Sequence, residues 1–228
     1  MAKTIRTISE CRKLIRKVNE QVRKANESEE YTYTDAEREG KIIKWYDGSI
    51  NCSNLSLTSL EGAPEYVKGD FICSGNYLTS LEGAPKEVKG DFICSYNNLA
   101  SLEGAPEKVG GSFWCYHNYL TSLKGAPKEV GGDFECFHSQ LTSLEGAPEY
   151  VKGNFSCFAN DLISLEGAPK EVKGDFICSY NDLTSLEGAP EKVGGNFDCS
   201  RNNLKRTTEE IEAELRKISN IKGKIKTQ

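Results

Sequence analysis

The sequence lacks any long run of apolar residues. No segment approaches the roughly 20 apolar residues that a bilayer-spanning helix needs. Residues 1–17 are basic and polar, and they lack the apolar core of a secretion signal. The sequence therefore predicts neither a membrane span nor export, and we expect a cytoplasmic protein that does not bind membranes.

Paired metal-binding motifs are also missing. Neither Cys-x-x-Cys nor His-x-x-x-His occurs, and the chain has only two histidines. A tetrahedral zinc site needs ligands that converge from several directions, which such paired motifs supply. We therefore expect no metal and no other cofactor.

Nine cysteines would suggest a disulfide framework in a small secreted protein. Eight of them, however, recur every 21 residues from Cys52 to Cys199. One cysteine at the same place in every repeat predicts a small buried apolar side chain with a free thiol.

The net charge of −5 is unevenly distributed. Residues 51–204 contain 11 basic and 21 acidic groups, whereas 1–50 contain 11 and 9 and 205–228 contain 7 and 4. An acidic central segment repels phosphate backbones, so general nucleic-acid binding is not expected. The same charge suits a basic protein surface, or it simply keeps the protein soluble.

Internal repetition decides the fold class. Seven near-identical 21-residue units follow one another, of which LTSLEGAPKEVKGDFICSYNN at 78–98 is an example. All seven prolines share one column, and phenylalanine, valine, glycine and two leucines each occupy columns of their own. A single unit cannot bury these residues, but stacked units can, so the sequence predicts a solenoid.

Each unit contains the features of one coil. Phe-x-Cys has a period of two, which predicts a short strand with both side chains turned inward. Gly-Ala-Pro predicts a turn on the far side. An asparagine follows the cysteine by three residues in every unit except one, which has Ser139. Inside the stack, its amide is expected to satisfy backbone groups of its own and neighbouring coils.

The segment F-x-C-S-x-N-x-L-T-S-L resembles the L-x-L-x-x-N-x-L segment of leucine-rich repeats. The wording L-T-S-L-E-G-A-P-x-x-V-x-G-x-F-x-C is similar to degenerate leucine-rich-repeat proteins encoded by tailed bacteriophages. This resemblance implies one continuous parallel sheet on a concave face, with short irregular connections on the convex face. It also implies an accessory factor that acts on a host protein, such as an inhibitor of a defence enzyme.

The resemblance covers the solenoid at 50–204, between a helical N-terminal segment at 1–49 and a C-terminal helical cap with a basic tail at 205–228. Thr7-x-x-Glu10 and an apolar stripe through Val22 predict an N-terminal helix, which either packs on the first coil or forms a homodimer. A second helix is expected from Thr34, followed by a hairpin over Lys41–Tyr46 and Ser49–Cys52. Thr207-x-x-Glu210 predicts a C-terminal helix, and the lysines after it are expected to be solvated.

Columns that stay constant serve packing, so outward columns that vary are the place to look for function. Serine usually follows the cysteine, but three consecutive units have an aromatic residue there instead. Both histidines occupy the next column, and the residue between Phe and Cys also changes in the same three units. The residues expected to form a partner-binding site are Trp114, Tyr116, His117, Tyr119, Glu135, Phe137, His138, Ser156 and Phe158.

Protein binding is the function that these residues favour, because aromatic side chains are enriched at binding hot spots. The opposing interpretation is that the repeats have drifted and the aromatic rings stack for stability alone. Self-assembly into a larger structure is the main alternative function, and carbohydrate binding is a minor one. An enzyme using His117, Glu135 and His138 is not expected, because no nucleophile or enclosing pocket accompanies them.

Overall fold

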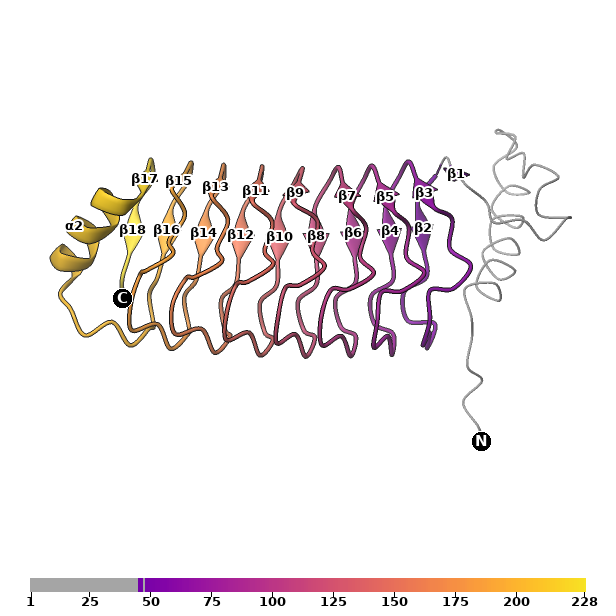
Figure 1. Ribbon diagram of the computed structural model, residues 1–228, viewed down its shortest axis with the longest axis horizontal. Helices are drawn as coiled ribbons and strands as arrows, with labels where there is room; N and C mark the ends of the chain where they lie inside the picture. Colours follow the sequence, from indigo (N-terminus) through magenta and orange to yellow (C-terminus); the bar gives the residue numbers. More distant parts are fainter. Residues whose placement is uncertain (1–44, 47) are drawn as a thin grey trace, which may run out of the picture.

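The chain winds into coils that are stacked along a nearly straight axis (Figure 1). The computed structural model describes residues 45, 46 and 48–228, and the repeats form a parallel β-solenoid of about seven turns. The predicted solenoid is therefore confirmed. The marked concave bend that the leucine-rich-repeat resemblance implies is not visible in this view.

Two parallel sheets, each of nine strands, run along the solenoid, and every coil contributes one two-residue strand to each. The valine sheet consists of β1 (Trp45–Tyr46), β3 (Tyr66–Val67), β5 (Glu87–Val88), β7 (Lys108–Val109), β9 (Glu129–Val130), β11 (Tyr150–Val151), β13 (Glu171–Val172), β15 (Lys192–Val193) and β17 (Asn220–Ile221). The phenylalanine sheet consists of β2 (Ile50–Asn51), β4 (Phe71–Ile72), β6 (Phe92–Ile93), β8 (Phe113–Trp114), β10 (Phe134–Glu135), β12 (Phe155–Ser156), β14 (Phe176–Ile177), β16 (Phe197–Asp198) and β18 (Ile225–Lys226).

The expectation of a single sheet was wrong. The phenylalanine sheet follows the predicted Phe-x-Cys pattern, but the valine sheet was not foreseen. A two-residue strand such as Glu129–Val130 contains one inward and one outward residue, which is too short to reveal a period of two. Its valine was correctly assigned to the core, but its backbone pairing becomes apparent only when the coils are stacked.

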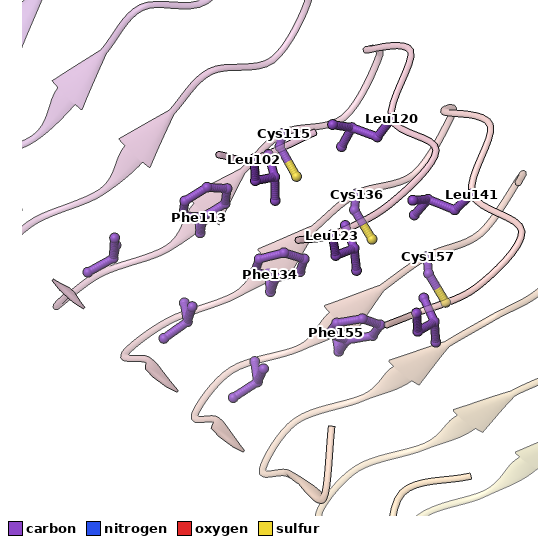
Figure 2. Packing of buried hydrophobic residues seen from close by; sticks show 14 of the residues in the cluster. Leu102, Phe113, Cys115, Leu120, Leu123, Phe134, Cys136, Leu141, Phe155 and Cys157 are labelled. Atoms are coloured by element: carbon purple, nitrogen blue, oxygen red, sulfur yellow. The ribbon is translucent and has the colours of Figure 1, made fainter. Parts of the chain in front are cut away.

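The core is a set of columns that run the length of the solenoid. Phenylalanine, cysteine and leucine side chains of successive coils lie directly behind one another, as Figure 2 shows for Phe113, Phe134 and Phe155. Neighbouring phenylalanine rings have centroids 5.0–5.8 Å apart. The eight repeat cysteines are buried and form no disulfide in the described part of the chain, as predicted.

The asparagine column joins coil to coil, which confirms its predicted role. Asn118 is typical: its Oδ1 accepts a hydrogen bond from the backbone N–H of Leu99 in the preceding coil at 3.0 Å. Its Nδ2 donates to the carbonyl oxygens of Cys94, in the preceding coil, and Cys115, in its own. The asparagines thus supply hydrogen bonds to buried backbone groups that lie outside the strands.

The predicted hairpin near residue 46 is wrong. Strands β1 and β2 lie in different sheets, and each pairs in parallel with the next coil. Tyr46, Gly48 and Ile50 have the spacing of Val67, Gly69 and Phe71, so this segment is a further coil whose apolar residues differ from the consensus. The two helices predicted before it, of which the first was the possible dimer helix, lie outside the described residues.

The lysines of the tail are exposed, as predicted, but the tail itself forms a further coil that was not predicted. Ile221, Gly223 and Ile225 repeat the valine, glycine and phenylalanine spacing, and they place β17 and β18 at the ends of the two sheets. Ile221 is buried, and the lysines alternate with these residues on the outside of the last coil. Lys226 lies 3.4 Å from Asp198, so this lysine is an ion-pair partner as well as a solvated group.

Helix α2 (Thr208–Ile218) packs beside β17 at the C-terminal end of the solenoid (Figure 1). It begins with the capping box expected from the sequence, in which Thr207 and Glu210 exchange side-chain and backbone hydrogen bonds. Ile211 and Leu215 are buried, whereas Ile218 is 46% exposed. No helix among the described residues is long and apolar enough to span a membrane.

Candidate functional site

The varied residues lie on the outside of the phenylalanine sheet and on the turn that follows it. In most coils the second strand residue is partly exposed and the cysteine is buried. The residue after the cysteine is partly exposed where it is aromatic, and the residue after that is partly or fully exposed. Strand pairing puts Glu135 opposite both Trp114 and Ser156 in the neighbouring coils. Because the repeat length is constant, equal positions of successive coils become neighbours.

The first column after the cysteine is a stack of three aromatic rings. The ring centroids of Tyr116 and Phe137 are 4.4 Å apart with planes 6° apart, and those of Phe137 and Phe158 are 4.5 Å and 18° apart. All three side chains are half-buried. They adjoin on the surface of the solenoid, as the sequence predicts, and their neighbours in the column are serines.

The second column is a parallel stack that the sequence only half reveals. His117 stacks on His138 at 4.7 Å and on Tyr96 at 4.5 Å. Tyr96 was missed, because tyrosine occurs twice in this column and therefore looked like the ordinary residue. Every residue here has a positive φ, between 49° and 65°, so the backbone aims each side chain in the same direction.

The two columns are inclined to each other in a herringbone. Rings in one column make angles of 75–83° with rings in the other, for example 75° between Tyr116 and His117. Offset parallel stacking within a column and edge-to-face contacts between columns are both favourable for aromatic rings. We call the six residues together the aromatic ladder: Tyr96, Tyr116, His117, Phe137, His138 and Phe158.

Trp114 and Glu135 lie beside the ladder on the strands. The indole of Trp114 is tilted toward Tyr116 at 6.3 Å. Its Nε1 is buried and has no hydrogen-bond partner in the described part of the chain. Burial, and secondarily the charge of Asp133, raise the pKa of the Glu135 carboxyl above its ordinary value.

Two of the predicted site residues do not join this surface. Ser156 is buried, with only 6% of its surface exposed, so a partner cannot reach it directly. Tyr119 is 57% exposed, but it makes no ring contact with any described residue and stands outside the ladder. The period of two placed Ser156 on the outer side of its strand without showing that neighbouring residues would cover it.

Beside the ladder, one inner coil breaks the asparagine column. Ser139 follows His138, and its Oγ is buried with no hydrogen-bond partner among the described residues. An asparagine here would accept from the backbone N–H of Leu120, as Asn118 does from Leu99. The backbone N–H of Ser139 itself donates to Asn160 at 3.2 Å.

The two imidazoles stack face to face, so their ring nitrogens do not point at each other. Burial and the neighbouring His138 lower the pKa of His117. In residues 48–228 no hydrogen bond links Glu135 to either imidazole, and no group of three His, Cys, Asp or Glu side chains is placed to hold a metal ion. These groups are adjacent, but they are not arranged as a proton relay.

A hollow of about 760 Å³ lies on the other sheet. It forms where Gly110 and Gly131 occupy positions that hold lysine in most coils. Its rim alternates in charge, since lysines 89, 108, 128 and 152 stand among glutamates 87, 107 and 129. Mixed charge and wide exposure make this hollow a weaker candidate for a site than the ladder.

Comparison with protein-family models gave no match for this chain, and neither did comparison with curated proteins.

Proposed function

We propose that the protein acts without catalysis, by binding another protein through the aromatic ladder. The observation that supports this most is the coincidence of unusual features in adjacent coils. Trp114 and Ser139 each leave a buried polar atom without a partner, and both lie in coils that also contain the ladder. Residues that lower the stability of the fold are expected mainly at functional sites.

A comparison of interaction energies shows why favourable ring packing alone does not explain the unusual residues of these coils. A buried polar group without a partner costs about 1–3 kcal/mol. A stacked aromatic pair contributes about 0.5–1.5 kcal/mol beyond its buried area. The cost of the unpartnered polar atoms is therefore similar in size to the gain from ring stacking. Coils with serine directly after the cysteine and asparagine three residues after it avoid the unpartnered atoms, so they would give a fold at least as stable.

Partner chemistry follows from what the ladder exposes. The rings inside each column cover one another's faces, so the ladder presents mainly edges to solvent and leaves a ring face open only at the ends of a column. Sugars bind aromatic residues through exposed ring faces, so the geometry disfavours a carbohydrate. Glu135 and the excess of acidic groups over the repeats favour a partner surface with basic residues around an apolar centre.

The resemblance to bacteriophage-encoded repeat proteins suggests the setting. We propose that the partner is a protein of a bacterial host, and that binding modulates or inhibits it, as an inhibitor of a defence enzyme would. The step from the ladder to this setting is by analogy. It predicts a stoichiometric complex with one bacterial protein.

Self-assembly is the alternative function. The described C-terminal end of the solenoid does not favour it, because Lys222, Lys224 and Lys226 surround the last strands. Lysines on an edge strand oppose pairing with another chain. An oligomer in sedimentation that survives mutation of the ladder would nevertheless support this alternative.

The test is affinity purification from bacterial lysate with three forms of the full chain. The ladder variant combines Tyr116→Ser with Phe137→Ser, the residue that most other coils have there. The control is Tyr150→Lys, which removes an exposed tyrosine from the valine sheet and places lysine between Glu129 and Glu171. We expect a protein that wild type and control retain and the ladder variant loses; a folded ladder variant that keeps every partner contradicts the proposal.

A further inference from the structure

The second column of the ladder is interrupted after His138. The next coil has Ala159 at this position, and the coil after that has Tyr180. Ala159 and Tyr180 have φ values of 53° and 54°, close to the 55° of Tyr96. The backbone therefore aims Tyr180 as it aims Tyr96, and one ring is missing between His138 and Tyr180.

The size of this interruption matches one ring. Each coil advances the column by one strand spacing, about 4.8 Å, and the rings of Tyr96, His117 and His138 are 4.5 and 4.7 Å apart. His138 and Tyr180 are two coils apart, so their separation along the stack is roughly twice that step. We call the space bounded by His138, Phe158, Ala159 and Tyr180 the Ala159 gap.

Exposure shows that the gap is open. His117 has a ring on either side and is half-buried, whereas His138 has a ring on only one side and is exposed. Tyr180 is 59% exposed and makes no ring contact with any described residue. One face of His138 is thus uncovered.

Phe158 forms the side wall of the gap. It meets His138 edge to face at 5.2 Å and 76°, and it stacks on Phe137. In the two preceding coils a second perpendicular contact, within one coil, joins Tyr116 to His117 and Phe137 to His138 at 5.8 and 5.7 Å. A ring placed over Ala159 would make this contact with Phe158.

We propose that the Ala159 gap receives one aromatic side chain that projects from the partner protein. This inference rests on the proposed function and deepens it, because it says which chemical group of the partner the ladder recognises. The four residues around the gap present aromatic rings and a methyl group, and none is a carboxylate. They suit a planar ring that stacks on His138 and meets Phe158 edge to face. A guanidinium group can also stack on aromatic rings, so the first test compares both groups.

The first test uses N-acetyl-tryptophanamide as a probe of the full chain by proton NMR. Because the protein has two histidines, its imidazole resonances are few, and His138→Gln assigns them. We expect a saturable upfield shift of the His138 resonances that is at least twofold larger than that of His117. Equal shifts, or a larger saturable shift with N-acetyl-argininamide, overturn the inference.

The second test fills the gap from within. Ala159→Tyr completes the column with a residue that Tyr96 and Tyr180 show to be compatible with this backbone. We expect it to abolish the probe shift and to weaken partner binding at least tenfold, with the fold retained. Ala159→Gly adds no side chain to the gap, and Gly75 shows that glycine adopts this backbone conformation. This variant should bind as wild type.

The outcomes separate this inference from the proposed function. If Ala159→Tyr binds the partner normally while the Tyr116→Ser, Phe137→Ser variant does not, the gap is not used and the ladder remains the site. If both variants bind normally, both proposals are wrong. A probe shift without any effect of Ala159→Tyr on the partner also overturns the inference.

Discussion

Replacing Ser139 with asparagine should stabilise the protein. At the equivalent place in the preceding coil, Asn118 accepts one hydrogen bond and donates two strong ones, over distances of 2.9–3.1 Å. Ser139 makes none of these with its side chain, and its Oγ is buried without a partner in the described region. Ser139→Asn should restore the bond from the Leu120 N–H and add donors to the carbonyls of Cys115 and Cys136.

The expected gain follows from counting these groups. A net intramolecular hydrogen bond contributes about 0.5–1.5 kcal/mol. The Cys115 and Cys136 carbonyls already accept from Asn118 and Asn160, so the new donors to them add little. The bond from Leu120 and the removal of the buried hydroxyl dominate, and together they suggest about 2 kcal/mol. For a chain of this size such a gain raises Tm by roughly 4–8 °C.

Thermal and urea unfolding, followed by far-UV circular dichroism, measure this change. Asn118→Ser is the matched reverse substitution, and it should lower the free energy of unfolding by a similar amount. The reasoning is refuted if Ser139→Asn leaves Tm unchanged or lowers it while Asn118→Ser destabilises. If Ser139 is retained for binding, the stabilised variant should also bind the partner less tightly.

Three further predictions concern the thiols, one histidine and the C-terminal cap. In a Cys11→Ser background the eight buried thiols should resist iodoacetamide at pH 8 until the protein is unfolded, because burial shields them from the reagent. Burial also raises the pKa of the seven thiols from Cys73 to Cys199, that of Cys199 to about 12. Rapid labelling of the native protein would contradict this prediction. Because the pKa of His117 is lowered in the folded protein, the unfolded state binds more protons than the folded state just below about pH 6.5. The free energy of unfolding should therefore fall as the pH decreases below that value. His117→Tyr should reduce this pH dependence, as measured by urea titrations at several pH values. The comparison is made in a Glu135→Gln background, because the raised pKa of Glu135 makes the free energy of unfolding rise, not fall, as the pH decreases. Thr207→Ala removes the capping box and should cost about 0.5–2 kcal/mol in the same assay, with Glu212→Ala in the same helix as the control.

The ends of the solenoid show where pattern recognition from sequence reaches its limit. The inner coils were recognised because their columns are nearly identical in residue type. The outer coils at Tyr46–Ile50 and Ile221–Ile225 keep only the spacing of two apolar residues around a glycine. An Asp-Gly pair and three lysines resembled a hairpin and a solvated tail more than they resembled a repeat. Pairing with an already formed neighbouring coil supplies the stability that their own residues do not signal.

For the repeats and the first column of the ladder, the sequence by itself was sufficient. A constant period of 21 residues makes equal positions neighbours whatever the path of the chain, so Tyr116, Phe137 and Phe158 had to adjoin once the coils stacked. The second sheet, the herringbone and the gap at Ala159 were decided only by the tertiary structure. They depend on how the backbone of each coil aims its side chains, which follows from hydrogen bonds between coils and from the positive φ after each cysteine, and neither can be read from residue types along one chain.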